Sequence, residues 1–243
     1  MIIINADDFG RSQRETDPAV SCFRQGRITS ASAMVFMTDS ERAAECAQDA
    51  RIDVGLHVNL SQPFTMQVKA KCLQQYHDRV VRFLTRNRYS LLFYHPALRR
   101  QFRYVYEAQV DEFVRLYGRR PTHVDGHRHN HLCANMLLDG IIPTHERVRR
   151  NFSFSPDEKG VVNRSYRRFI DRSLARRYKV TDFFFSLQQC LQHDRLTRVF
   201  ELAKLGVVEL MTHPANHEEY AYLMSDAYRL ALDRLETGTY SSL

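Results

Sequence analysis

Short apolar runs alternate with amphipathic stretches along most of the 243-residue chain. The first run, Ile2-Ile3-Ile4, is β-branched and ends in polar residues, which predicts a buried strand. Similar runs predict further strands at 28–36, 54–60, 122–126, 146–152, 180–185 and 207–212. Amphipathic stretches predict helices at 15–25, 40–50, 98–117, 132–139, 165–178, 194–205 and 218–235. This alternation, repeated about seven times, predicts one α/β domain over 1–243 with a parallel sheet or barrel.

Residues 62–96 depart from the alternation. The segment is basic and aromatic, and we interpret it as an insertion into the domain that contains some helix. The chain contains neither a dinucleotide-binding G-x-G-x-x-G motif nor a P-loop, which argues against a nucleotide-binding fold.

The chain carries a formal charge of +7, with arginine concentrated in 79–120 and 147–177. Such a surface attracts anions without defining a binding site, and a solvated basic surface is the simpler interpretation. Five widely separated cysteines fit reduced thiols. Without a visible signal peptide or a membrane-spanning apolar run, we expect a cytoplasmic protein.

Polar residues interrupt the apolar pattern at four predicted strands: Asp7 and Asp8 after the first, His57 in the third, His123, Asp125 and His127 along the fourth, and His213 after the last. The carboxyl ends of barrel strands meet at one face, where active sites lie. We therefore expect these side chains to converge. The alternative is that each is a hydrogen-bonded polar residue at the mouth of the barrel.

One carboxylate and two imidazoles form a sensible ligand set for a divalent cation, and three protein ligands leave positions open for water and substrate. Asp8, His57 and His127 are the candidates. Asp7 could then accept a proton from water, although an Asx-turn or helix cap would also explain one of the two aspartates. His213 could donate a proton to a leaving group, or could simply cap a helix.

The stretch THVDGHRHNH, residues 122–131, holds four histidines. One strand cannot direct all of their rings at a single ion, so the other ligands must come from elsewhere. We expect Asp125 to orient a ligating imidazole and His123 to lie deeper in the strand. His129 and His131 are expected to line the pocket or to begin the next helix.

Four blocks together resemble the YdjC-like carbohydrate deacetylases, the ChbG group: NADDFG at 5–10, GLHVNL at 55–60, PTHVDGHRHNH at 121–131 and THPA at 212–215. The resemblance implies a distorted (β/α) barrel and a metal-dependent hydrolase that removes acetyl from an N-acetylated amino sugar. It implies Asp8, His57 and His127 as metal ligands, Asp7 as general base and His213 as general acid. His123, Asp125, His129 and Asn59 are expected to support the ligands or to contact substrate.

The cation implied by the resemblance is Mg²⁺, although two imidazoles also suit Zn²⁺ or another transition ion. Related enzymes suggest a homodimer. The family often has an arginine near the fifth strand, and the sequence Val148-Arg149-Arg150-Asn151 leaves open which arginine corresponds. The first helix begins Arg11-Ser12-Gln13-Arg14, where family members more often carry small, apolar residues.

Two other functions compete with deacetylation. A metal-dependent phosphoester hydrolase would use the same acidic and imidazole groups, and the basic surface would suit its anionic substrate. A nucleic-acid-binding module would use the arginines and aromatic residues of 79–120, but it leaves the polar strand ends unexplained. We therefore expect no nucleic-acid partner.

Overall fold

The computed structural model describes residues 1–68, 70–154 and 160–243. Six parallel strands form one curled sheet in the order β4-β3-β2-β1-β6-β5. The strands are β1 (Ile2–Phe9), β2 (Ser30–Ala33), β3 (Asp53–Val58), β4 (Val124–Gly126), β5 (Phe183–Ser186) and β6 (Val208–Thr212). The predicted parallel α/β class is confirmed, whereas the predicted number of about seven strands is wrong.

The missing strand is the one predicted at 146–152. In the structure this segment makes isolated bridges from Val148 to Val124 and from Arg147 to Lys179, not a continuous ladder. Further along, the Ser153 amide donates to the Phe184 carbonyl at 2.8 Å. The segment therefore crosses the gap between β4 and β5, and too few consecutive bonds form on either side for a strand.

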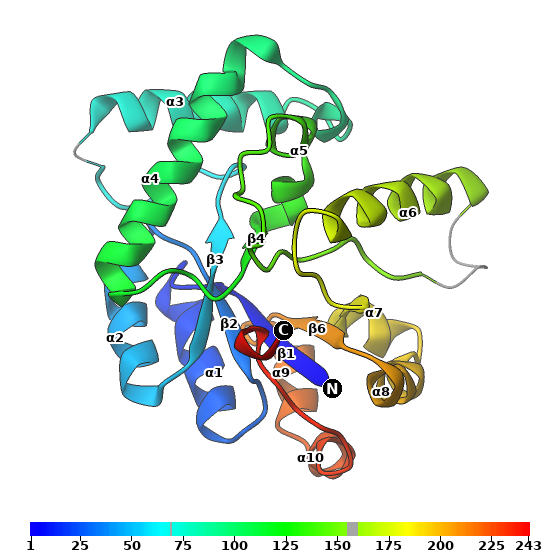
Figure 1. The fold of residues 1–243 in the computed structure, drawn as a ribbon. Helices are drawn as coiled ribbons and strands as arrows, with labels where there is room; N and C mark the ends of the chain where they lie inside the picture. The colour runs from blue at the N-terminus through cyan, green and yellow to red at the C-terminus, as the bar shows by residue number, and fades with distance from the viewer. Residues whose placement is uncertain (69, 155–159) are drawn as a thin grey trace.

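Helices surround the sheet on its outer side (Figure 1). The α-helices are α1 (Gln13–Arg24), α2 (Ser40–Ala50), α3 (Lys71–Leu84), α4 (Arg99–Tyr117), α5 (Ala134–Leu138), α6 (Val161–Ala175), α7 (Leu187–Gln192), α8 (Leu196–Leu205), α9 (His217–Leu223) and α10 (Asp226–Leu232). The described residues also form the 3₁₀ helices η1 (Ser90–Leu92), η2 (Pro96–Leu98), η3 (His127–Leu132) and η4 (Tyr240–Ser242). Within the described ranges, no helix combines the length and the apolarity needed to cross a membrane.

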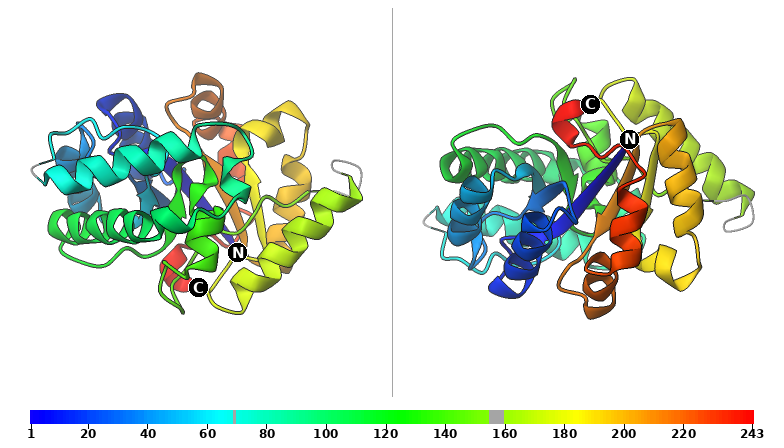
Figure 2. Two further views of the ribbon diagram at one scale, coloured as in Figure 1. Left: turned by 90° about the horizontal axis from the view of Figure 1, so that it is seen from above. Right: turned by 90° about the horizontal axis from the view of Figure 1, so that it is seen from below.

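The structure differs from the predicted helices in two places. The helix predicted at 218–235 is divided into α9 and α10, because the Ser225 side chain accepts the Tyr228 amide and starts a new helix. Helix α7 was not predicted. The segment 62–96, interpreted as an insertion with some helix, contains α3 and η1 and ends at the first residue of η2. Residue 69 lies outside the described residues. Helix α3 runs beside α4, as Figure 2 shows from above.

The core lies against β1, the strand between β2 and β6. All eight residues of β1 are buried, as its unbroken apolar start predicts. The chain's end returns to this strand, since the Ile2 amide donates to the Glu236 carbonyl and the Gly238 amide donates to that of Ile2. The C-terminal turn η4 is therefore held next to the interior of the sheet, where Tyr240 is fully buried.

Candidate metal centre

A β-bulge brings the two aspartates of β1 to the same site. Consecutive residues of a regular strand point to opposite faces, so Asp7 and Asp8 would normally diverge. The register with β2 shifts between Ala6 and Phe9, and Asp8 has a φ of 62°. A positive φ is uncommon outside glycine, and bulges often redirect side chains next to active sites. The bulge therefore explains how adjacent aspartates can serve one centre.

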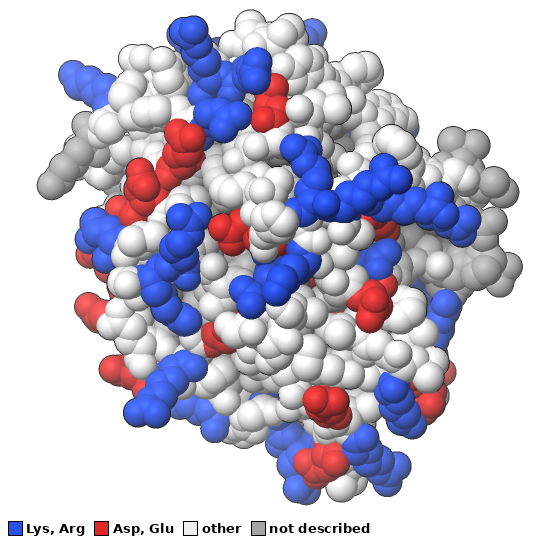
Figure 3. Space-filling model, in the orientation of Figure 1, with Lys and Arg blue, Asp and Glu red and all other residues white. Residues whose placement is uncertain are grey.

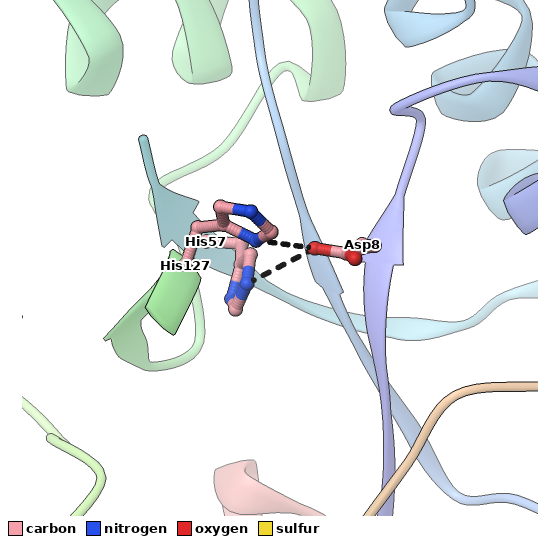
Figure 4. Close-up of side chains that lie close together, drawn as sticks. All are labelled: Asp8, His57 and His127. Carbon is pink, nitrogen blue, oxygen red and sulfur yellow. Dashed lines mark hydrogen bonds and ion pairs between the residues drawn. The ribbon is translucent and has the colours of Figure 1, made fainter. Parts of the chain in front are cut away.

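Asp8, His57 and His127 come together at the carboxyl ends of β1, β3 and β4 (Figure 4). Asp8 Oδ1 lies 2.8 Å from His127 Nδ1 and 3.3 Å from His57 Nε2. The candidate ligand atoms of the three residues all lie within 4.8 Å of one another. The convergence predicted from the strand ends is therefore present, and one cation could contact all three side chains.

Asp125 fixes the orientation of His57. Its Oδ1 lies 2.8 Å from His57 Nδ1, which leaves His57 Nε2 facing Asp8. Burial alone would lower the pKa of His57, but Asp125 and Asp7 raise it, with hydrogen bonds to Asp125 and Asp8, to about 10. The carboxylates thus favour a positive charge at His57 Nε2. A divalent cation supplies that charge in place of a proton, so the donor set fits a metal.

Arg149 is the main residue whose place the sequence did not reveal. It is fully buried, and its Nη1 and Nη2 lie 2.7 Å from the two oxygens of Asp7. Nη2 also lies 2.7 Å from Asp125 Oδ2, and Nε lies 2.7 Å from Glu209 Oε1. One guanidinium therefore contacts and aligns three buried carboxylates, including the candidate base. A glutamate inside the apolar run 207–212 was a sign that such a partner exists.

A second polar layer lies beneath these groups. The Ser32 hydroxyl donates to Asp125 Oδ2 at 2.8 Å and lies 2.9 Å from His123 Nε2. Since the one hydroxyl proton is used by Asp125, His123 donates from Nε2 to Ser32. The His123 ring stacks on Tyr240, with centroids 3.7 Å apart, and the Tyr240 hydroxyl donates to Glu209. His123 therefore lies deeper than the cluster, as its place in the strand predicted.

The close packing of this layer depends on Gly55. A Cβ at that position would lie 2.3 Å from the His123 ring. Any larger residue at position 55 would therefore displace the histidine, so the glycine is required by the close approach of the His123 ring to the backbone.

His213 lines a cavity together with the two aspartates of β1. The cavity has a volume of about 520 Å³, and Asp7, Asp8 and His213 contribute to its lining. The His213 amide donates to Glu219 Oε2 at 2.9 Å, and its Nδ1 lies 3.7 Å from Glu219 Oε1. Burial lowers the pKa of His213, but the interactions with Glu219 and with Asp7 more than compensate and raise it. The imidazole is therefore suited to holding a proton beside the cavity.

The remaining predicted residues lie around the centre without contacting the cluster. His129 belongs to η3, where its ring meets those of Phe152 and Phe184 edge-on. His131 is fully buried, and its Nε2 lies 3.0 Å from the Arg149 carbonyl oxygen. Asn59 shapes the turn after β3, because its side chain accepts two backbone amides and donates to the Gln62 carbonyl. The role predicted for Asn59 at the substrate stays a prediction.

Two arginines at the start of α1 border the same cavity. Arg11 Nη1 lies 3.1 Å from Asp8 Oδ2, and Arg14 is exposed. Both also line an adjoining cavity of about 340 Å³ next to Thr38 and Thr65. These two arginines thus place positive charge beside the candidate site.

Comparison with known proteins relates this arrangement to one family. The family model described as YdjC-like protein matches residues 1–234. A carbohydrate deacetylase of Mus musculus is 30% identical over 246 residues, covering 92% of this chain and 76% of the mouse protein. A chitooligosaccharide deacetylase of Proteus mirabilis is 31% identical over 147 residues, covering 56% of this chain and 52% of the bacterial protein.

A solved structure supports the fold alone. It is described as a candidate cellobiose-phosphate cleavage protein from Enterococcus faecalis, and it superposes with a TM-score of 0.69 at 18% identity. The superposition covers 99% of this chain and 97% of the other. Because the family model extends over nearly the whole length, through all four of the motif blocks, this chain belongs to the YdjC-like protein family.

Proposed function

We propose that the protein is a cation-dependent hydrolase that removes the acetyl group from an N-acetylated amino sugar. The observation that carries the proposal is the convergence of Asp8, His57 and His127 beside Asp7, at the edge of a cavity. The names of the related mouse and bacterial proteins, carbohydrate and chitooligosaccharide deacetylase, supply the substrate class.

Asp8, His57 and His127 would hold the cation. When bound, such a cation lowers the pKa of water and stabilises negative charge on a carbonyl oxygen. Asp125 keeps the His57 ring turned so that Nε2 remains available. Hydrogen bonds of this kind to ligating histidines commonly strengthen metal binding.

Asp7 is the proposed proton acceptor. Its Oδ1 accepts from Asn5 and from Arg149, whereas its Oδ2 accepts from Arg149 and lies 4.0 Å from His57 Nε2. A carboxylate oxygen accepts about two hydrogen bonds, so Oδ2 keeps one free position on the side of the cluster. Arg149 thereby orients Asp7 so that it can take a proton from the attacking water.

His213 is the proposed proton donor. It lines the same cavity as Asp7 and Asp8, where the departing amine of the sugar would lie. Glu219 and the aspartates raise its pKa, which keeps the imidazole protonated to higher pH. A protonated imidazole can transfer its proton to the amine as the C–N bond breaks.

Metal removal and a single substitution test the proposal. The purified protein is treated with a chelator, reloaded with Mg²⁺ or Zn²⁺, and assayed for acetate release from a panel of N-acetylated sugars. One carboxylate with two imidazoles suits Zn²⁺, whereas the family resemblance implies Mg²⁺, and the reloading series decides between them. His57→Ala should abolish both metal binding and activity. The matched control His193→Ala changes an exposed histidine and should preserve both.

Full metal content and activity in the His57→Ala protein would contradict the ligand assignment. Acetate release that survives complete metal removal would contradict the dependence on a cation.

A phosphoester hydrolase is the second candidate. The arginines at 11 and 14 favour it, because both border the cavity and would attract an anionic substrate. Release of phosphate from a generic phosphoester, with no release of acetate from the sugar panel, would replace the deacetylase proposal with this one.

Quaternary structure and location are proposals as well. Related enzymes suggest a homodimer, and light scattering of the purified protein measures its molar mass directly. Fractionation of the source cells tests the cytoplasmic location that the free cysteines suggest.

A further inference from the structure

One stretch of the chain is strongly basic. Residues 79–103 include seven arginines and no aspartate or glutamate: Arg79, Arg82, Arg86, Arg88, Arg99, Arg100 and Arg103. Among the described residues, Arg99 is the only one of these that pairs with a carboxylate, at 3.1 Å from Asp139. Figure 3 shows Lys and Arg side chains gathered around the upper end of α4, where this stretch ends. The charge of this region is therefore largely uncompensated.

Large apolar side chains are exposed within the same stretch. Phe93 is 63% exposed, Tyr89 is 50% exposed and Leu92 is 48% exposed. Leu138, at the end of α5, is 72% exposed. It is next in sequence to Asp139, which accepts a hydrogen bond from the Tyr94 hydroxyl at 2.9 Å. We call Tyr89, Leu92, Phe93, Tyr94 and Leu138, with Arg86, Arg88 and Arg100, the aromatic-basic face.

The aromatic-basic face is held in place by hydrogen bonds. The His95 amide donates to Asn135 Oδ1 at 2.9 Å, and Asn135 Nδ2 donates to the His95 carbonyl at 3.0 Å. The Phe83 ring packs edge-on against that of His95. These contacts join the segment after α3 to helix α5. The apolar side chains are therefore presented outward by an ordered scaffold and do not fold back onto the core.

We propose that the aromatic-basic face docks on a membrane surface that contains anionic lipids. Clustered exposed apolar side chains usually mark an interaction site. Aromatic and leucine side chains can enter the boundary between headgroups and acyl chains, while arginines contact anionic headgroups. Leu92 and Leu138 favour a membrane over a nucleic acid, because aliphatic side chains add burial in lipid but offer no ring for a base to stack on.

Docking would also orient the candidate site. His77 of α3 bonds through Nε2 to the Asn59 carbonyl oxygen at 3.0 Å, which ties α3 to the carboxyl end of β3. The cluster of Asp8, His57 and His127 lies at the carboxyl ends of the strands. The aromatic-basic face and the cluster are therefore on the same side of the sheet. A membrane bound at this face would therefore lie on the side of the sheet toward which the carboxyl ends of the strands point.

Vesicle binding tests the inference without any enzymatic assay, so its outcome is independent of the proposed deacetylase activity. The chain has no tryptophan, and Phe93→Trp therefore introduces a single fluorescent reporter. With vesicles in which about a third of the lipid is phosphatidylglycerol, its emission should shift to shorter wavelength and be quenched by brominated lipids. Leu205→Trp, at a site that is 83% exposed on α8, is the matched control and should not respond.

Two sets of substitutions separate the apolar and the electrostatic contributions. Leu92→Ser with Phe93→Ser should weaken vesicle binding by at least about tenfold in a sedimentation assay. Replacing Arg86, Arg88 and Arg100 by Gln should weaken it by roughly fivefold per arginine and should reduce its salt dependence. Replacing Arg24, Arg198 and Arg234 by Gln removes the same charge elsewhere and should have much less effect.

Each other result overturns the inference. Equal vesicle binding by the two triple Arg→Gln variants would mean that net charge alone attracts the protein to the vesicles. A blue shift of the Phe93→Trp reporter that grows with protein concentration without vesicles would show that a second copy covers the face. Oligonucleotide binding that depends on the three arginines, with no response to vesicles, would assign the face to nucleic acid.

Discussion

Replacing Arg149 by Lys tests the buried network most directly. The substitution keeps one positive charge but removes the planar fork that binds both oxygens of Asp7. A lysine ammonium is a point charge on a flexible stem, and it cannot reproduce the contacts to Asp7, Asp125 and Glu209 together. The variant therefore keeps the positive charge but loses the paired hydrogen bonds that orient Asp7.

The expected size follows from the hydrogen bonds that the guanidinium makes. Each hydrogen bond to a charged group contributes about 1.5–3 kcal/mol, and Arg149 is fully buried, so solvent does not screen its partners. Because lysine would leave at least two of these hydrogen bonds unmade, we expect the free energy of unfolding to fall by about 3–6 kcal/mol. Proteins have about 5–15 kcal/mol of stability in total, so the variant should lose a large part of its free energy of unfolding. In the folded fraction, misplacement of Asp7 should lower kcat by about 100-fold.

Urea unfolding measures the change in stability, and acetate release per folded molecule measures the change in kcat. Arg150→Lys is the matched control at the next position. The Arg150 side chain is 21% exposed and has one carboxylate partner, Asp171 at 2.9 Å, so Arg150→Lys should destabilise the protein less than Arg149→Lys. Equal destabilisation by Arg149→Lys and Arg150→Lys would contradict the stabilising role of the buried network. A wild-type kcat in Arg149→Lys would show that Arg149 does not align the base.

Two further substitutions address the residues that support the centre. Asp125→Asn keeps the size of the side chain but removes the charge beside His57. Metal affinity, measured by competitive chelator titration, should therefore fall by about 10–100-fold. Unchanged affinity would show that Asp125 does not support His57 as a ligand. Glu219 raises the pKa of His213, so Glu219→Gln should lower that pKa. The His213 imidazole should then lose its proton at a lower pH than in the wild-type protein. The alkaline limb of the kcat/KM profile should therefore move to lower pH, and a limb that stays in place would exclude His213 as the donor.

The local pattern of the sequence determined the order of strands and helices and the positions of the candidate ligands. The apolar start of β1 and the polar ends of β1, β3 and β4 are local features, and parallel topology brings such ends to one edge. For that reason Asp8, His57 and His127 could be singled out before their distances were known.

Only the tertiary structure decided how the site is completed. The bulge at Asp8 depends on the register with β2, which no pattern within β1 reveals. Arg149 meets Asp7 across 142 residues of chain, and local periodicity carries no information about a pairing so distant. The segment 146–152 has the composition of a strand. A strand also needs a neighbour with a continuous row of hydrogen-bond donors and acceptors, and this segment forms only isolated bridges. Periodicity reports which side of an element is buried, whereas partners are set by where the sheet closes and by the need to neutralise charges inside it.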